Sequence, residues 1–217
     1  LYNIAHCFVV IIINNQLKHY GGDLAIASYG VINRIVFVFA MIIMGLNQGM
    51  QPITGYNYGA KQYDRMLRSF YLTCLYATGV MAIIFILGEC FPRQITQIFT
   101  HDINLIEQTI TPMRIICSTM LIIGFQMVAG NFFTSIGMAG KSIFLSMTRQ
   151  VLFLIPLLLF VPLLFENPVL GVWWAIPISD TMAAITAAIM LGISIKHFRG
   201  LINEQEAWKV TCPPEPD

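Results

Sequence analysis

The chain has 217 residues, of which 57% are hydrophobic and only 11% are charged, and its formal net charge is +1. Soluble globular domains carry about a quarter charged residues, so this composition, with a mean hydropathy of +0.72, excludes an ordinary soluble fold. The near-neutral charge balance also argues against a nucleic-acid partner, because no sustained basic face is available.

Apolar residues come in blocks of roughly 17 to 27, each long enough to cross a ~30 Å hydrocarbon core. We therefore predict an all-α integral membrane bundle of six transmembrane helices. The predicted spans are residues 1–17, 24 to about 53, about 70–88, 113–138, about 142–165 and 168–195. A short amphipathic segment, 94–107, is expected outside the hydrocarbon. Residues 1–200 are expected to form one lobe and 201–217 a polar cytoplasmic tail, with disorder expected from residue 196 onward.

The stretch 45–65, GLNQGMQPITGYNYGAKQYDR, is interpreted as the exit of the second span into a tightly built cytoplasmic loop. Gly45 and Gly49 are four residues apart, so on a helix they share a face that lets another backbone approach closely. Pro52 removes a helical N–H group, and Gly55 permits backbone angles that other residues resist. An ordinary Gly/Asn turn after a helix is the alternative interpretation.

Lysine and arginine residues are unevenly divided between the two sets of loops. The loops after the second and fourth spans, together with the tail, hold Lys61, Arg65, Arg68, Lys141, Lys196, Arg199 and Lys209. The opposite side holds Lys18, Arg93 and Arg114. The positive-inside rule assigns the richer side to the cytoplasm, which predicts a multi-pass protein of the cell (inner) membrane with a cytoplasmic C-terminus.

Polar residues inside the predicted spans are costly in hydrocarbon and are therefore the candidate substrate and cation pathway. These residues are Asn3, His6, Asn14, Asn33, Arg34, Gln48, Gln51, Gln126, Asn131, Arg149 and Asp180. In the first span, four polar residues fall within about 100° of helical arc, which predicts a polar stripe facing other helices or water: Asn3, His6, Cys7 and Asn14. Interhelical hydrogen bonds that only hold helices together are the alternative explanation of this stripe.

The charged residues Arg34 and Asp180 are the sharpest of these signals. At 1.5 Å per residue they lie roughly 15 Å and 18 Å from the outer boundary of the membrane, and this similar depth favours an ion pair. Arg149, roughly 10 Å inside the cytoplasmic boundary, is the substitute partner of Asp180. If Asp180 instead faces an aqueous cavity alone, it becomes a candidate for proton coupling.

The sequence carries no motif typical of catalysis or metal binding. It lacks HExxH, GxSxG and a phosphate-binding GxxxxGK[ST] loop, so we do not expect an enzyme. Its five cysteines and four histidines are scattered and include no CxxC pair, so no metal site is predicted.

Five stretches together resemble the multidrug and toxic compound extrusion (MATE) family of transporters, and most closely its bacterial multi-antimicrobial-extrusion subgroup. They are INNQL at 13–17, YGVINR at 29–34, GYNYGA at 55–60, TRQVLFLIP at 148–156 and GVWWAIPISD at 171–180. They occur in the family's order, and the resemblance covers nearly all of residues 1–200.

The resemblance implies the C-terminal half of a twelve-helix transporter, with a central cavity between this lobe and a missing N-terminal six-helix half. Members of the family lie in membrane lipid and export small amphipathic cationic drugs against an inward flow of H⁺ or Na⁺, without any other cofactor. A carboxylate that sodium-type members carry in the tenth helix is replaced by Ile123 in this sequence, and another in the seventh helix falls near His6. The resemblance therefore does not extend to a carboxylate-lined Na⁺ site in this lobe. A lipid-linked oligosaccharide flippase of the same superfamily and a membrane partner that does not transport are the alternatives.

Overall fold

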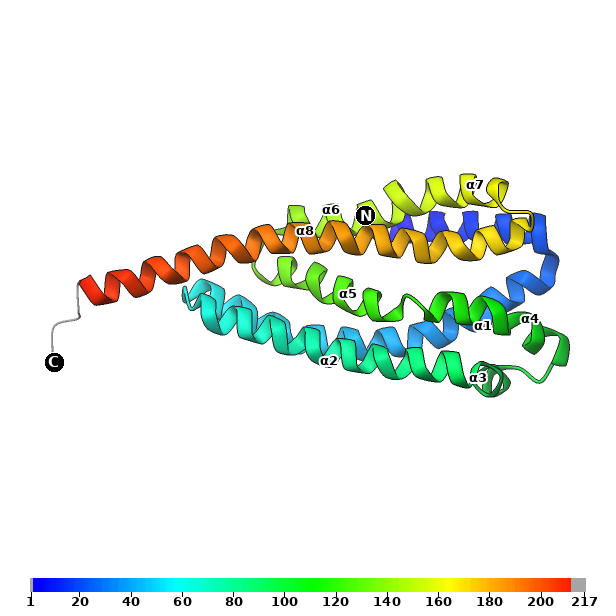
Figure 1. Cartoon of the computed structure of the whole chain (residues 1–217), viewed down its shortest axis with the longest axis horizontal. Coiled ribbons are helices and arrows are strands. Elements are labelled where there is room, and N and C mark those ends of the chain that lie inside the picture. Colours follow the sequence, from blue (N-terminus) through cyan, green and yellow to red (C-terminus); the bar gives the residue numbers. More distant parts are fainter. Residues whose placement is uncertain (1, 212–217) are drawn as a thin grey trace.

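The computed structural model of the protein describes residues 2–211, with side chains described for residues 6–205. Its regular elements are the helices α1 (Tyr2–Gly59), α2 (Tyr63–Cys90), α3 (Pro92–Phe99), α4 (Ile103–Cys117), α5 (Met120–Ser135), α6 (Ala139–Met147), α7 (Ile155–Leu164) and α8 (Pro168–Thr211), with a π-helix, η1 (Thr148–Leu154), between α6 and α7. The long helices run along one axis and form an elongated bundle (Figure 1). The predicted all-α class is confirmed.

Helix α1 consists of two arms that meet at Gly22. This glycine has φ 70° and ψ −167°, a backbone conformation that side-chain-bearing residues rarely adopt. Figure 1 shows the arm before Gly22 running toward one end of the bundle and the arm after it running back. The two arms are therefore separate membrane crossings, as the apolar blocks 1–17 and 24–53 predict.

The number of crossings follows from the lengths and hydropathies of the helices. Four helices in the described part are long and apolar enough to span a membrane, and the bent pair α4 and α5 makes a fifth. Division of α1 at Gly22 brings the count to six, which agrees with the prediction.

The predicted fourth span, 113–138, is wrong in detail. Helix α4 begins already at Ile103 and is bent from α5 by 51° at Ser118 and Thr119. The predicted amphipathic segment is likewise divided into α3 and the start of α4, because Asp102 caps α4 by accepting a hydrogen bond from the backbone N–H of Asn104 at 3.0 Å.

Two other expectations about local structure are corrected. The stretch 45–65 is helical as far as Gly59 with Pro52 inside the helix, so the loop is limited to residues 60–62. The polar tail is helical as far as Thr211 instead of disordered from residue 196, since α8 continues past the apolar block.

Close packing between helices occurs at a different glycine from those that the sequence suggested. A Cβ atom at Gly49 or Gly45 would meet no described atom within 4 Å, so the predicted tight face is absent among the described residues. A Cβ atom at Gly171 would instead lie 2.7 Å from Cα of Pro162. Helices α7 and α8 therefore pack backbone against backbone at Gly171.

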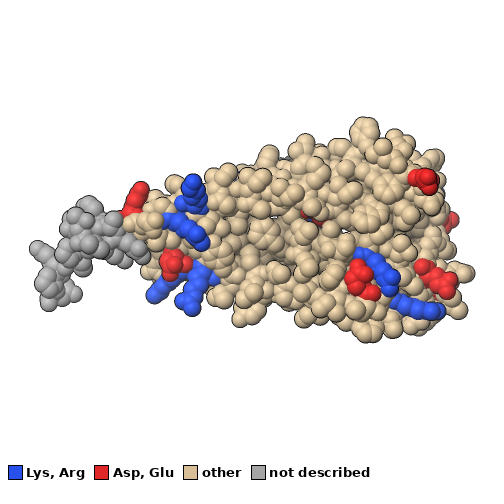
Figure 2. Space-filling view, in the orientation of Figure 1, with Lys and Arg blue, Asp and Glu red and all other residues tan. Residues whose placement is uncertain are grey.

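The surface of the bundle is that of a membrane protein. Figure 2 shows the charged side chains gathered toward the two ends, with a broad and largely uncharged band between them. Large apolar side chains remain exposed on this bundle, among them Leu164 (81%), Leu163 (72%) and Ile193 (67%). Such a surface is stable only against lipid or other protein, so the chain is an integral membrane protein.

Candidate functional site

An ion pair joins η1 to α8 inside the bundle. Nε of Arg149 donates a hydrogen bond to Oδ1 of Asp180 at 2.7 Å. Asp180 is 2% exposed, and the side chain of Arg149 is 26% exposed. The prediction that Arg34 pairs with Asp180 is wrong, because Arg34 is exposed on α1. Asp180 is paired with Arg149, which was the substitute partner.

Polar side chains beside the ion pair extend the site to α1. Oγ of Ser179, which is fully buried, donates to the backbone carbonyl of Arg149 at 3.2 Å. Nε2 of Gln150 lies 3.4 Å from Nδ1 of His6. The polar cluster formed by His6, Arg149, Gln150, Ser179 and Asp180 thus connects three elements.

Two members of the polar cluster, Gln150 and Ser179, were missed at the level of sequence. An uncharged amide directly after Arg149 in an apolar span was the available signal for Gln150, because buried amides seek partners. Ser179 gave no comparable signal, since serine is common in membrane helices.

The backbone of η1 contributes to this arrangement. π-Helical turns inside α-helices are rare and occur often at functional sites, because they displace carbonyl groups from the regular ladder. Here the π-helix spans Thr148–Leu154 and carries both Arg149 and Gln150. The hydroxyl of Ser179 satisfies one carbonyl of this segment from the neighbouring helix.

Two buried oxygen atoms of the polar cluster remain available as acceptors. Oδ2 of Asp180 and Oε1 of Gln150 have no hydrogen-bond partner within the described residues. Buried acceptors are normally satisfied, so each of these atoms can accept a hydrogen bond from a water molecule or from a donor of another group. No group of three or more His, Cys, Asp or Glu side chains in the described part is arranged to hold a metal ion.

The other predicted pathway residues of α1 differ in exposure. On the second arm of α1, Asn33, Arg34, Gln48 and Gln51 are all exposed. On the first arm Asn14 is half-buried, and the side chain of Asn3 lies outside the described residues. The exposed residues of the second arm are therefore surface groups of this bundle.

Polar residues of α5 and of the adjacent part of α1 are buried separately. Gln126 is 8% exposed, and its Oε1 has no partner within residues 6–205. Nδ2 of Asn131 donates to the backbone carbonyl of Met127 at 3.1 Å, which is a bond within its own helix. Asn47, which the sequence analysis did not select, is 2% exposed with both amide atoms unpartnered in the same range. Ile123 is buried in α5.

Curated relatives of this chain are multidrug exporters. Multidrug export protein MepA of Staphylococcus aureus (strain MSSA476) is 26% identical over 192 residues, which cover 88% of this chain and 41% of MepA. The protein of the same name from Staphylococcus saprophyticus is 24% identical over 181 residues, covering 83% of this chain and 39% of the relative. The chain therefore spans about four-tenths of the length of the curated relatives it matches.

Solved transporter structures share the fold. The structure of the MATE multidrug transporter DinF-BH is 37% identical with a TM-score of 0.75, and the match covers 88% of this chain and 42% of that one. An outward-facing conformation of a multidrug resistance MATE family transporter of the MOP superfamily has a TM-score of 0.85 at 19% identity, covering 92% of this chain and 45% of that one.

A family model gives the same assignment across most of the sequence. The model described as MatE matches residues 1–160, which include both arms of α1, α2 to α6 and the π-helix with Arg149. The chain belongs to the MatE family.

Proposed function

We propose that the chain is the C-terminal six-helix lobe of a multidrug efflux transporter that exports small amphipathic cationic drugs by antiport with H⁺ or Na⁺. The observation that carries this proposal is the match to multidrug export protein MepA over 88% of this chain. The structure of DinF-BH supports it, because that multidrug transporter is 37% identical to this chain.

The partner of this lobe is a second six-helix lobe within the same transporter. The match covers only 41% of MepA, so the remainder of such a protein has room for another lobe of similar size. The exposed polar face of α1, with Asn33, Arg34, Gln48 and Gln51, supports this arrangement. Such side chains are costly against lipid, and a water-filled cavity between two lobes removes that cost.

The charges of this lobe indicate which half of the transporter attracts a cationic drug. Asp180 is neutralised by Arg149, and Ile123 cannot ligate Na⁺, whereas Arg34 adds a positive charge to the exposed face. The negative charge that attracts a cationic drug is therefore assigned to the second lobe.

The topology we propose places the chain in the cell (inner) membrane with its C-terminus in the cytoplasm. The end of the bundle that holds the α1–α2 turn carries Lys61, Arg65, Arg68, Lys196 and Arg199. The Lys/Arg excess at this end is what the positive-inside rule expects of the cytoplasmic side.

Efflux by the complete protein tests the proposed function. Cells that express it should extrude ethidium, a small amphipathic cation, and collapse of the driving gradient should stop the efflux. Varying the pH gradient and the Na⁺ gradient separately identifies the coupling ion. Normal abundance in the membrane without efflux of the dye would overturn the proposal.

A further inference from the structure

An open groove lies between α2 and α8 at the end of the bundle that carries the α1–α2 turn. Its volume is about 670 Å³. Its lining includes Asp64, Arg68, Tyr71, Leu72 and Leu75 from α2 and Arg199 from α8. The function proposed above does not involve this groove, which lies away from the polar cluster around Asp180.

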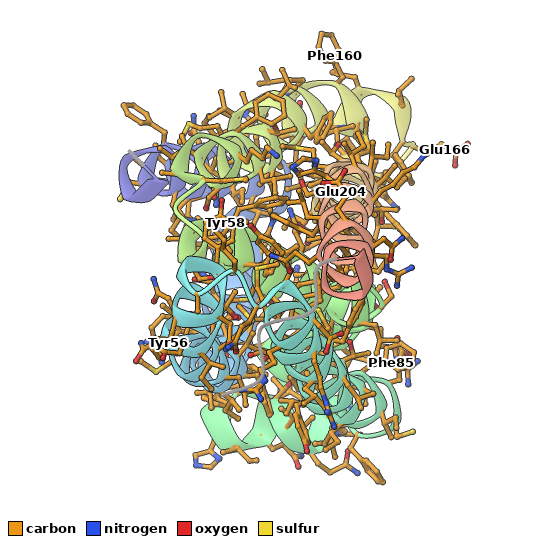
Figure 3. The ribbon with its side chains drawn as sticks, turned by 90° about the vertical axis from the view of Figure 1, so that its left-hand side faces the viewer. Tyr56, Tyr58, Phe85, Phe160, Glu166 and Glu204 are labelled. Atoms are coloured by element: carbon orange, nitrogen blue, oxygen red, sulfur yellow. The ribbon has the colours of Figure 1, made fainter. Side chains whose placement is uncertain are left out.

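Aromatic packing fixes the two walls of the groove. Phe198 is 2% exposed, and its ring stacks on Tyr63 at a centroid distance of 5.7 Å and meets Tyr58 edge-on at 6.0 Å. Figure 3 views the bundle from this end, with Tyr58 directed to the interior and Tyr56 at the margin. Because Phe198 is anchored, the next residue, Arg199, is held at the mouth of the groove.

Hydrogen bonds between the two helices support the same geometry. Nη2 of Arg199 donates to the hydroxyl of Tyr71 at 3.4 Å. Farther along α8, Nε2 of Gln205 donates to the backbone carbonyl of Lys61 at 3.3 Å. The C-terminal part of α8 is thus tied both to α2 and to the α1–α2 turn.

Polarity changes along the groove in the order that a phospholipid requires. Arg68, Leu72 and Leu75 are spaced i, i+4 and i+7, so they share one face of α2. Leu75 lies about 10 Å farther along the helix than Arg68, toward the uncharged band. Leu72 and Leu75 are 46% and 68% exposed, which leaves an apolar track leading away from the two arginines.

We propose that this groove binds an anionic phospholipid, with its phosphate between Arg68 and Arg199 and an acyl chain along Leu72 and Leu75. Basic pockets between membrane helices on the cytoplasmic side are suited to anionic lipid headgroups. The two arginines exceed the single carboxylate of Asp64 by one positive charge, which matches a singly charged headgroup such as phosphatidylglycerol. Asp64 repels a second negative charge, so a free phosphate dianion fits less well.

Lipid retention by the intact protein, measured by native mass spectrometry, tests this site. The detergent-purified protein is incubated with phosphatidylglycerol, with phosphatidylcholine of the same chain length, or with inorganic phosphate. We expect retention of phosphatidylglycerol over the other two. Arg68→Gln and Arg199→Gln should each weaken it by about fivefold, the effect of one basic residue near an anionic lipid.

The matched control is Arg93→Gln combined with Arg114→Gln, which removes two exposed arginines from the opposite end of the bundle. Retention should survive in this control and in Arg68→Lys, which also shows whether a loss at Arg68 reflects charge or misfolding. Unchanged retention in the Arg68→Gln/Arg199→Gln variant overturns the proposal. The proposal is also overturned if phosphatidylcholine binds as strongly as phosphatidylglycerol with the same dependence on the arginines, or if inorganic phosphate displaces phosphatidylglycerol. In either case the groove does not select an anionic lipid.

Discussion

Arg149 and Asp180 form a buried ion pair inside the bundle. Their 2.7 Å bond is charge-assisted and nearly removed from solvent at the Asp180 end. Removing one partner of a buried ion pair lowers the free energy of unfolding by more than the intact pair contributes to it, because the remaining charge is then buried alone.

We expect Arg149→Gln to reduce the abundance of the protein in the membrane. The change leaves Asp180 buried without its cation, which costs about 3–5 kcal/mol of stability. Quantitative blotting of membranes and thermal unfolding in detergent measure this loss. The double variant Arg149→Gln/Asp180→Asn should recover part of it, and Arg34→Gln, which neutralises an exposed arginine, should retain wild-type abundance. Wild-type stability of Arg149→Gln would show that the ion pair contributes nothing.

A charge exchange distinguishes the two arginines. The variant Arg149→Asp/Asp180→Arg restores opposite charges at positions that face each other, so its abundance should exceed that of either single variant. The variant Arg34→Asp/Asp180→Arg should show no such recovery, since Arg34 does not contact Asp180. Membrane abundance of all five variants is the measurement, and recovery only in the Arg34 pair would contradict the structure.

At the scale of elements, helix contacts depend on the direction in which each face points. The backbone of α8 approaches α7 at Gly171, whereas Gly45 and Gly49 face open space on α1. The glycine spacing that the sequence offers is compatible with either situation, because small residues permit close packing without enforcing it.

We predict that Gly171→Ala destabilises the lobe by about 1–3 kcal/mol, the usual cost of overpacking. The new methyl group would lie 2.7 Å from Cα of Pro162, and backbone at that position cannot move aside as a flexible side chain can. Thermal unfolding measures the effect. Gly49→Ala, which meets nothing within 4 Å, is the matched control and should unfold at or above the wild-type temperature. A lower unfolding temperature for Gly49→Ala but not for Gly171→Ala would contradict this prediction.

The sequence was sufficient for the number and order of the crossings but not for their contacts. The apolar blocks were enough to count and order the crossings, and Gly22 divides α1 between the first two blocks. The bend between α4 and α5 falls at Ser118 and Thr119, so it could not be predicted from a proline or glycine at that point. The partner of Asp180 was misassigned because depth along a helix says nothing about the direction in which a side chain points.

At the scale of the whole molecule, charge is arranged along the long axis of the bundle. Both ends carry charged side chains and the band between them is largely uncharged, which fixes how the bundle lies across a membrane (Figure 2). Which end faces the cytoplasm is the part that we assign from the Lys/Arg excess.

Cysteine labelling checks this orientation. In a background without the five native cysteines, Gln62→Cys and His101→Cys place single exposed thiols in the α1–α2 turn and in the α3–α4 loop. An impermeant maleimide added to intact cells should label position 101 at once and position 62 only after permeabilisation. The reverse pattern would invert the topology.

The ion pair also has a consequence for synthesis at the ribosome. Its two members are separated by 31 positions and lie in successive crossings, so the segment with Arg149 reaches the translocon ahead of the segment with Asp180. A lone arginine near the centre of a helix opposes insertion by about 2.5–3.5 kcal/mol. The segments that carry the pair are therefore expected to enter the bilayer together, as a hairpin. The charge of Arg149 is neutralised only when α8 brings Asp180 beside it.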